Sequence, residues 1–311
     1  MASVEHGVAD VIIIGGSYAG LSAAMALGRA LRSVLIIDSG LPCNRQAPHS
    51  HNFITQDGEA PGAIAAKARE QVLGYPTVRL IDGRASAASK LEDRFEVTTE
   101  AGDRYAGRKL LFATGVTDLM PDIPGFAECW GISVAHCPYC HGYEVRDTTI
   151  GVVGNGDMGF EFARLISNWT NRLTLFTDGP STLTDEQRSA LELHAIPIVE
   201  PRLRQLEHEN GQIVNLLLDD ESRHPMTTLF ARTPFVQHCA IPEQLGCAID
   251  EPGYIVVDDF KRTTVSGVYA AGDNTTMLRS VAGAVAAGGL AGAMINKELI
   301  EESFHRAAGH A

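Results

Sequence analysis

The stretch Val11-Ile-Ile-Ile-Gly-Gly-Ser-Tyr-Ala-Gly20 decides the fold of this chain. Its four β-branched residues predict a buried strand, and the glycines that follow predict a tight turn. The alanine-rich segment from Leu21 to Leu31 then predicts a helix, and the apolar run 33–37 predicts a second strand. A strand, a glycine-rich turn, a helix and a parallel strand form the unit that binds one half of a dinucleotide.

Four residues of this unit are candidate cofactor-binding residues. Gly15 and Gly20 suit the turn and the close approach of helix and strand, and Ser17 stands where the motif GxGxxG has its second glycine. A pyrophosphate can then meet the backbone amides at the N-terminus of the helix, and Asp38 can accept hydrogen bonds from a ribose. A plain tight turn would use the same glycines, so this motif alone leaves both interpretations open.

A second unit of the same kind lies in the middle of the chain. The run 149–153 predicts a strand, Gly154-Asn-Gly-Asp-Met-Gly159 is a complete GxGxxG, a helix is expected to about Trp169, and the strand 173–177 ends at Asp178. The candidate residues for a nicotinamide nucleotide are therefore Gly154, Gly156, Gly159 and Asp178. Two such units predict an α/β fold with two Rossmann-like three-layer (ββα) dinucleotide-binding domains, the second inserted into the first.

The domain boundaries are expected near clusters of proline. Prolines at 121, 124, 234 and 242 mark the two places where the chain would cross between domains. We expect residues 1–116 and 244–311 to form the outer domain and residues 117–243 to form the inner one.

The outer domain is expected to contain further strands and a long helix. The segments 94–98 and 104–105 predict antiparallel strands that lead into 109–115, and 267–273 predicts a late strand ending in Gly-Asp. The helix expected from Ser280 to about Ile300 is rich in small residues, which close backbone packing explains without a further function.

Composition and charge exclude several classes of protein. The chain has 311 residues, is 45% hydrophobic and carries a formal net charge of −13, so nucleic acid and anionic membrane surfaces would repel it. It has no apolar run near the roughly eighteen residues of a membrane helix. Residues 1–10 lack the basic region of a signal peptide, so we expect a cytoplasmic protein in which six cysteines do not form a disulfide framework.

The closely spaced pair in Cys137-Pro-Tyr-Cys140 is then a candidate for redox chemistry. With His141 it also matches CxxCH, the haem attachment motif, but haem attachment normally requires export. Zinc is a second alternative, but the adjacent ligands His136, Cys137, Cys140 and His141 cannot easily surround one tetrahedral ion, and no second CxxC is present. We therefore expect no metal and a redox-active disulfide.

The order and spacing of the motifs resemble the low-molecular-weight thioredoxin reductases along essentially the whole chain. The resemblance rests on 11–20, Ala113-Thr-Gly115, the CxxC and 267–273. It implies FAD in the outer domain, a NAD(P)-binding-like inner domain that carries the CxxC, and a homodimer. The positions that it places against FAD are Gly15, Ser17, Gly20, Asp38, Thr114, Gly272 and Asp273. It also implies that Cys140 faces the flavin and that Cys137 attacks the substrate sulfur.

The sequence around the cysteines departs from the ordinary reductases. His141 stands where they usually have an acid–base aspartate, and the run from His136 to Glu144 is more similar to the gliotoxin- and holomycin-type dithiol oxidases. Those flavoenzymes close dithiols into disulfides and pass the electrons to oxygen. The segment His49-Ser-His-Asn52 also resembles that branch, although a purely structural loop is an equal alternative. We expect His141 to move the proton of thiol–disulfide exchange, the alternative being a hydrogen-bonded imidazole at a helix start.

The second nucleotide partner stays open. Reductases that use NADPH have a basic cluster after the second strand, whereas here Asp178 is followed by no Lys or Arg until Arg188. A carboxylate facing a 2′-phosphate is a like-charge contact, which disfavours NADPH. Two interpretations remain: an NADH-type site, or a domain that no longer binds a nicotinamide nucleotide.

We therefore expect a FAD-dependent thiol/disulfide oxidoreductase that moves electrons between a substrate, the cysteine pair Cys137–Cys140 and FAD. A dithiol oxidase is the main hypothesis, and an NAD(P)H-dependent thioredoxin-disulfide reductase is the alternative. A non-catalytic redox-sensing flavoprotein is an alternative of another class. The expected partner is a small dithiol or disulfide, or a thioredoxin-like protein. The sequence does not fix the direction of electron flow, because small differences in redox potential decide it.

Overall fold

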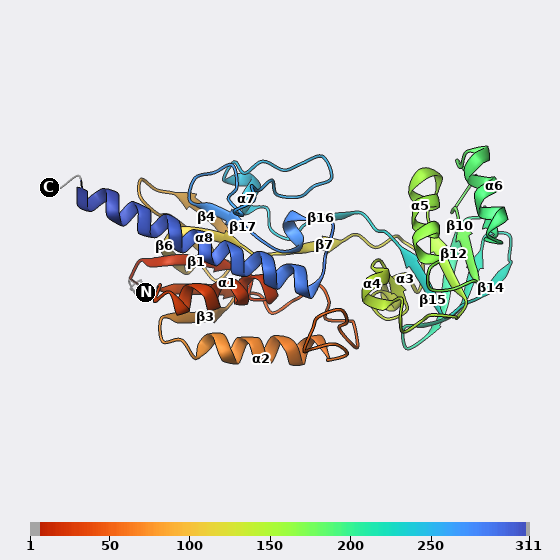
Figure 1. Ribbon diagram of the computed structural model, residues 1–311, viewed down its shortest axis with the longest axis horizontal. Helices are drawn as coiled ribbons and strands as arrows, with labels where there is room; N and C mark the ends of the chain where they lie inside the picture. The colour runs from red at the N-terminus through yellow and green to blue at the C-terminus, as the bar shows by residue number, and fades with distance from the viewer. Residues whose placement is uncertain (1–6, 309–311) are drawn as a thin grey trace. The chain divides into compact units, whose positions relative to one another are not determined.

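The computed structural model describes residues 7–308, and the contacts within it divide the chain into two compact units. Unit 1 comprises the described residues up to Arg45, residues 53–117 and those from Phe235 onward (Figure 1). Unit 2 comprises residues 46–52 and 118–234. The expectation that the N-terminus lacks a signal peptide falls mostly on residues 1–6, which lie outside the described residues.

Unit 1 is built on a parallel sheet. Its parallel strands are, in spatial order, β3 (Val78–Asp82), β2 (Val34–Asp38), β1 (Ala9–Ile14), β6 (Arg104–Phe112) and β17 (Val268–Ala270). In β1, Val11 and Ile13 pack into one apolar cluster and Ile12 and Ile14 into another. Because both faces of the sheet are covered, the strand is a continuous apolar run rather than an alternating one.

Three helices accompany this sheet: α1 (Tyr18–Arg29), α2 (Pro61–Leu73) and α8 (Val281–Ala308). Helix α8 runs along α1 (Figure 1). A Cβ atom at Gly288 would lie 2.0 Å from the Ala19 carbonyl oxygen, and one at Gly292 would lie 2.7 Å from that of Ala23. Two glycines of α8 are therefore explained by close backbone packing, as expected.

An ion cluster also holds α8 to the sheet. Lys109 of β6 is only 4% exposed, and its ammonium group pairs with the carboxylates of Glu298 and Glu302 on α8. The Tyr269 hydroxyl donates to Glu298, and Arg108 pairs with Glu302 at 2.8 Å. A buried ammonium group is tolerated because it is fully paired.

The remaining strands of unit 1 confirm the antiparallel prediction. Strand β5 (Phe95–Thr99) pairs antiparallel with both β4 (Ala85–Lys90) and β6. The short elements are α7 (Ile241–Gln244) and the 3₁₀ turn η1 (Asp273–Thr275). Where the chain crosses between the units, β7 (Val116–Asp118) pairs with β16 (Phe235–Gln237).

Unit 2 repeats the parallel architecture. Its parallel strands are, in spatial order, β11 (Ile198–Val199), β10 (Leu173–Phe176), β9 (Ile150–Val153), β15 (Thr228–Ala231) and β8 (Val134–Ala135). Its antiparallel sheet consists of β12 (Leu203–Glu209), β13 (Gln212–Leu218) and β14 (Arg223–Pro225). Its helices are α3 (Phe126–Cys129), α4 (Pro138–His141), α5 (Gly156–Ile166) and α6 (Asp185–Leu193). The predicted fold class, an α/β chain with one parallel-sheet domain inserted into another, is confirmed.

Candidate active site

The turn between β1 and α1 brings the helix unusually close to the strand. Gly15 has a φ of 104°, and a Cβ atom at Gly20 would lie 1.9 Å from the Gly15 carbonyl oxygen. The Gly16 amide donates to Asp38 Oδ1 at 2.9 Å, so the end of β2 lies directly beside the turn. The structure thus brings together the four residues that the first motif singled out.

The N-terminus of α1 is suited to an anion. Its N-cap residue, Ser17, makes no side-chain hydrogen bond to the helix, and the first turn of this fully described helix holds no acidic residue. The helix dipole and the first amide groups of α1 therefore present positive potential with no carboxylate in the first turn, and the Asp38 carboxylate binds the Gly16 amide, which precedes the helix.

Thr114 and the Gly272–Asp273 turn lie at the same edge of the sheet, after β6 and β17. Asn274 connects them, because its Nδ2 donates to the Phe112 carbonyl at 2.9 Å and to Thr114 Oγ1 at 3.4 Å. Asn274 is fully buried, and among the described residues its Oδ1 has no hydrogen-bond partner. A buried acceptor without a partner is rare in proteins and fits a site completed by a ligand. Sequence reasoning missed Asn274, although it directly follows the Gly-Asp pair.

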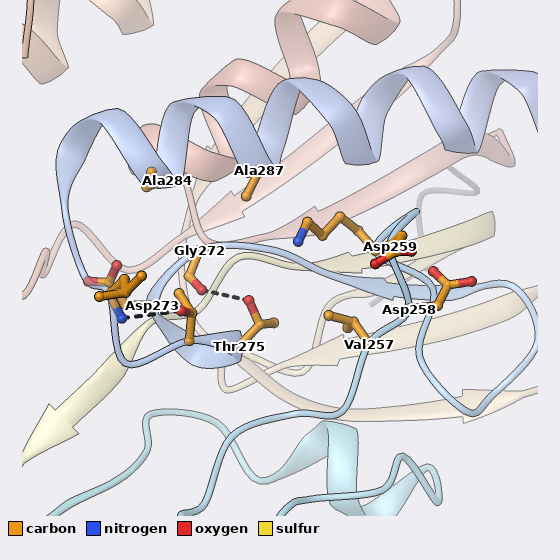
Figure 2. A pocket seen from close by; sticks show the side chains of 12 residues that line it. Val257, Asp258, Asp259, Gly272, Asp273, Thr275, Ala284 and Ala287 are labelled. Carbon is orange, nitrogen blue, oxygen red and sulfur yellow. Dashed lines mark hydrogen bonds between the residues drawn. The ribbon is translucent and has the colours of Figure 1, made fainter.

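A cavity of about 450 Å³ opens beside the Gly272–Asp273 turn (Figure 2). Ala284 and Ala287 of α8 line one side of it, and Val257 and Asp258 line another. Cys43 does not line this cavity, but its Sγ contacts Oδ2 of Asp273 at 3.6 Å. Cys43 therefore lies near a predicted cofactor residue, although the sequence indicated no role for it.

The redox motif lies in unit 2, at the start of α4. Cys137 and Cys140 form a disulfide with their Cα atoms 5.3 Å apart, and both residues are half-buried. Tyr139, between them, is 63% exposed and meets Trp169 edge-on, with ring centroids 5.6 Å apart. The predicted disulfide is thus formed, and its surroundings are aromatic.

His141 is the last residue of α4, and its neighbours come from two segments. Burial lowers the pKa of His141, the nearby Glu144 carboxylate raises this pKa, and His51 lowers it. His51 Nδ1 lies 3.5 Å from Glu144 Oε1. The segment 46–52 belongs to unit 2 by its contacts, which explains how a histidine far away in sequence reaches this place. Sequence reasoning missed Glu144, although it lies three positions after His141, and residues at this spacing are neighbours on a helical turn.

The second glycine-rich turn has the backbone of a nucleotide motif but different surroundings. A Cβ atom at Gly159 would lie 2.5 Å from the Gly154 carbonyl oxygen, and Gly156 has a φ of 54°. The Asn155 side chain accepts hydrogen bonds from the Gly156 amide at 2.9 Å and from the Thr182 amide at 2.8 Å. The N-terminus of α5 is therefore capped by the chain itself, and Asp157 adds a carboxylate to the first turn.

The Asp178 side chain, after the end of β10, is already hydrogen-bonded within the protein. The φ of Asp178 is 51°, and its Oδ1 accepts a hydrogen bond from the Leu203 amide at 2.8 Å. A cation that the sequence did not indicate is close by, since Arg202 Nε lies 4.0 Å from where a Cβ atom at Gly179 would be. The structure therefore brings Gly154, Gly156 and Gly159 together but gives the carboxylate of Asp178 a structural partner.

Two further features concern metals and membranes. Within residues 7–308, no group of three or more His, Cys, Asp or Glu side chains is arranged to hold a metal ion. No helix within the same residues is long and apolar enough to cross a membrane.

Comparison with known proteins identifies relatives along nearly the whole chain. Residues 9–288 match the family model described as pyridine nucleotide-disulphide oxidoreductase. "Thioredoxin reductase tcpT" of Claviceps purpurea is 36% identical, with 95% of each chain covered. The crystal structure of HlmI is 34% identical, with a TM-score of 0.93 over 100% of this chain and 98% of that one. The crystal structure of an oxidoreductase from Agrobacterium tumefaciens is 39% identical, with a TM-score of 0.89 over 94% of this chain and 99% of that one.

Proposed function

The chain belongs to the pyridine nucleotide-disulphide oxidoreductase family, and we propose that within it the protein works as a dithiol oxidase. It is a thioredoxin reductase-like flavoenzyme whose cofactor is FAD. The proposed reaction converts one dithiol and one oxygen molecule into one disulfide and one hydrogen peroxide. Two electrons and two protons leave the dithiol and appear in the peroxide, so the reaction balances.

The residues at the sheet edge of unit 1 fit FAD. The amides at the N-terminus of α1 would bind its pyrophosphate, and Asp38 would bind the adenosine ribose. Gly272 and Asp273 would receive the ribityl chain, and the unpartnered Asn274 Oδ1 can accept a hydrogen bond from a ligand group there. When bound, FAD supplies an acceptor for an electron pair.

The cysteines and His141 carry the thiol chemistry in this proposal. His141 takes the proton of a substrate thiol, and the resulting thiolate attacks Cys137 Sγ. The bond between Cys137 and Cys140 breaks, and Cys140 leaves as a thiolate with the electron pair. The second substrate thiol loses its proton by the same route and attacks the substrate sulfur of the mixed disulfide. The bond from that sulfur to Cys137 Sγ breaks, Cys137 leaves as a thiolate, and the product disulfide is released. Cys140 is then the cysteine that hands the electron pair on.

The observation that carries the proposal is the difference between the two helix N-termini. In α1 the N-cap side chain makes no hydrogen bond to the helix and the first turn has no carboxylate, whereas in α5 Asn155 occupies the first amide and Asp157 adds a negative charge. Asp157 is held in place by Gln187 Nε2 at 2.7 Å. One motif therefore favours a pyrophosphate and the other disfavours it, which supports electrons entering from a dithiol rather than from a nicotinamide.

An oxygen electrode with a peroxide assay tests this function. We expect purified protein with a small aliphatic or aromatic dithiol to consume oxygen and form peroxide in equal amounts, without any nucleotide. Cys137→Ser should abolish this turnover while FAD stays bound. Absence of oxygen consumption with every dithiol, together with NADPH-dependent reduction of thioredoxin, would refute the proposal. Steady turnover of any dithiol would also exclude a redox sensor without catalytic activity.

One observation favours the reductase alternative. Arg202 lies close to Gly179 and offers the cation that a 2′-phosphate needs. If NADPH is a substrate, Arg202→Ala should weaken its use more than that of NADH, because only NADPH has the 2′-phosphate. In a dithiol oxidase the same variant should leave dithiol turnover unchanged.

The assembly and the location belong to the proposal as well. We propose a cytoplasmic homodimer that acts on a small dithiol or on a thioredoxin-like protein. Light scattering after size-exclusion chromatography should give twice the mass of the 33.3 kDa chain.

A further inference from the structure

Tyr18, in the first turn of α1, has a hydroxyl group that joins two distant places in the chain. The hydroxyl donates a hydrogen bond to the Pro61 carbonyl oxygen at 3.0 Å and accepts one from Asn44 Nδ2 at 3.3 Å. A carbonyl oxygen can only accept and an amide nitrogen can only donate, so the directions of both bonds are fixed. Asn44 and Pro61 flank the segment 45–60, so one hydroxyl group closes the base of this loop.

The protonation state of Tyr18 suits both hydrogen bonds. The residue is only 8% exposed. Burial raises the pKa of Tyr18, and the hydrogen bond from Asn44 lowers this pKa by less. The phenol therefore keeps its proton at neutral pH, so it donates to Pro61 while it accepts from Asn44.

The loop 45–60 has little packing of its own to hold its shape. Within these residues, all of which the structure describes, Ser50 alone is buried, and Ile54 is 84% exposed. Thr55 has a φ of 72°, which is an unfavourable conformation for a β-branched residue. Such a conformation persists only where the surrounding structure holds it. The shape of the loop therefore depends on the contacts at its base.

The two residues before the loop lie across the cofactor site. Cys43 Sγ contacts Asp273 Oδ2 at 3.6 Å, and the next residue, Asn44, reaches the first turn of α1. Asp273 fits the ribityl chain of FAD, and the N-terminus of α1 fits the pyrophosphate, which is the next part of the same molecule. The segment 43–44 thus connects the two places that fit the middle of FAD.

We propose that Tyr18 is a positioning residue that clamps the loop 45–60 and thereby holds the segment 43–44 over FAD as a strap. The proposal rests on the cofactor site of the proposed function and deepens it. FAD leaves only when the strap opens, so the clamp acts mainly on the rate of FAD dissociation.

Tyr18→Phe tests the clamp, because it removes the hydroxyl group and keeps the buried ring. After dilution of the holoprotein without dithiol, the growth of free flavin fluorescence gives the rate of FAD dissociation. We expect this rate to rise about tenfold, since two hydrogen bonds are lost. Asn44→Ala removes one of the two bonds and should raise the rate about threefold.

Trypsin reports the state of the loop separately from the release of FAD. Arg45 is exposed, and the segment 45–60 contains no other Lys or Arg. With saturating FAD, cleavage after Arg45 should be slow in the wild-type protein and clearly faster in Tyr18→Phe. Faster release of FAD without faster cleavage would show that Tyr18 acts on the cofactor directly. Faster cleavage with unchanged release would show that the loop does not retain FAD, and either result would overturn the clamp.

Tyr75→Phe is the matched control. Tyr75 lies outside the loop, and its hydroxyl accepts a hydrogen bond from Arg29 Nη1 at 3.3 Å. Removing this hydroxyl should leave both the release of FAD and the cleavage after Arg45 unchanged. If Tyr18→Phe also matches the wild type in both assays while a dithiol drives oxygen uptake, the clamp fails and the oxidase stands. If the clamp behaves as expected but no dithiol drives oxygen uptake, the proposed function fails instead.

Discussion

Substituting Gly20 by alanine tests the first dinucleotide motif. A Cβ atom at Gly20 would lie 1.9 Å from the Gly15 carbonyl oxygen, whereas ordinary contact begins at 3.4 Å. The N-terminus of α1 must therefore move away from the turn by 3.4 − 1.9 = 1.5 Å. Overpacking of this kind costs about 1–3 kcal/mol of stability. For a domain of this size the melting temperature should fall by roughly 2–12 °C.

The effect on FAD should exceed the effect on stability. Hydrogen bonds to a pyrophosphate need donor–acceptor distances of about 2.7–3.2 Å, so a displacement of this size breaks them. Each bond to a charged group contributes about 1.5–3 kcal/mol, and the affinity should fall by roughly one to two orders of magnitude for each bond lost. Titration of apoprotein with FAD, followed by flavin fluorescence, measures this affinity.

Gly62→Ala is the matched control. Gly62 lies in α2, and a Cβ atom there would meet no atom within 4 Å. This variant should keep the wild-type affinity and gain up to about 1 kcal/mol of stability, because alanine restricts the unfolded chain. If Gly20→Ala binds FAD as tightly as Gly62→Ala does, the close approach of α1 is not what forms the cofactor site.

Three further predictions concern the disulfide, the ion cluster and pH. Cys140→Ser should abolish dithiol-driven bleaching with FAD still bound, and Cys137→Ser should show a long-wavelength charge-transfer band; a band in Cys140→Ser instead would reverse the two roles. Lys109→Met removes the ammonium group from two partly buried carboxylates and leaves Glu298 with the Tyr269 hydroxyl and Glu302 with Arg108, so thermal unfolding should show a loss of about 2–4 kcal/mol. Burial lowers the pKa of His141 below its ordinary value of 6.5. Stability should therefore fall only below about pH 6.5, where the unfolded chain binds a proton more readily than the folded one. The oxidation rate should also fall only below about pH 6.5, because His141 must be neutral to accept a proton. An oxidation rate that already declines as the pH falls through 7.5 would contradict a lowered pKa of His141.

Much of the fold could be predicted because its signals are local. Buried parallel strands appear as continuous apolar runs, and the glycines mark turns whose geometry no other residue fits. The hairpin of β12 and β13 was not predicted, although Asn210-Gly211 at its turn is a recognised hairpin signal and both residues have positive φ. Helix α8 continues to Ala308, beyond the expected end near Ile300, because residues 301–308 are mostly good helix formers.

Only the parts of the site that form short sequence motifs could be predicted. The disulfide and the glycine turns are consecutive in sequence, so spacing alone revealed them. The unpartnered Oδ1 of Asn274 becomes evident only after folding, since it depends on which groups surround it. The contact between His51 and Glu144 joins segments far apart in the chain, and Arg202, which directly precedes β12, lies near Gly179 only in the folded chain. Contacts between residues far apart in the chain cannot be predicted from patterns in a single sequence.

The most direct test of the oxidase account is to mix the oxidised protein anaerobically with dithiothreitol, NADH or NADPH at equal, sub-millimolar concentrations. Stopped-flow absorbance of the flavin then shows which reductant delivers electrons. We expect fast bleaching by the dithiol, slow or no bleaching by NADH and the poorest reduction by NADPH, followed by recovery of the flavin colour when oxygen is admitted. Fast, saturable bleaching by NADPH would contradict the account and identify the protein as an ordinary reductase.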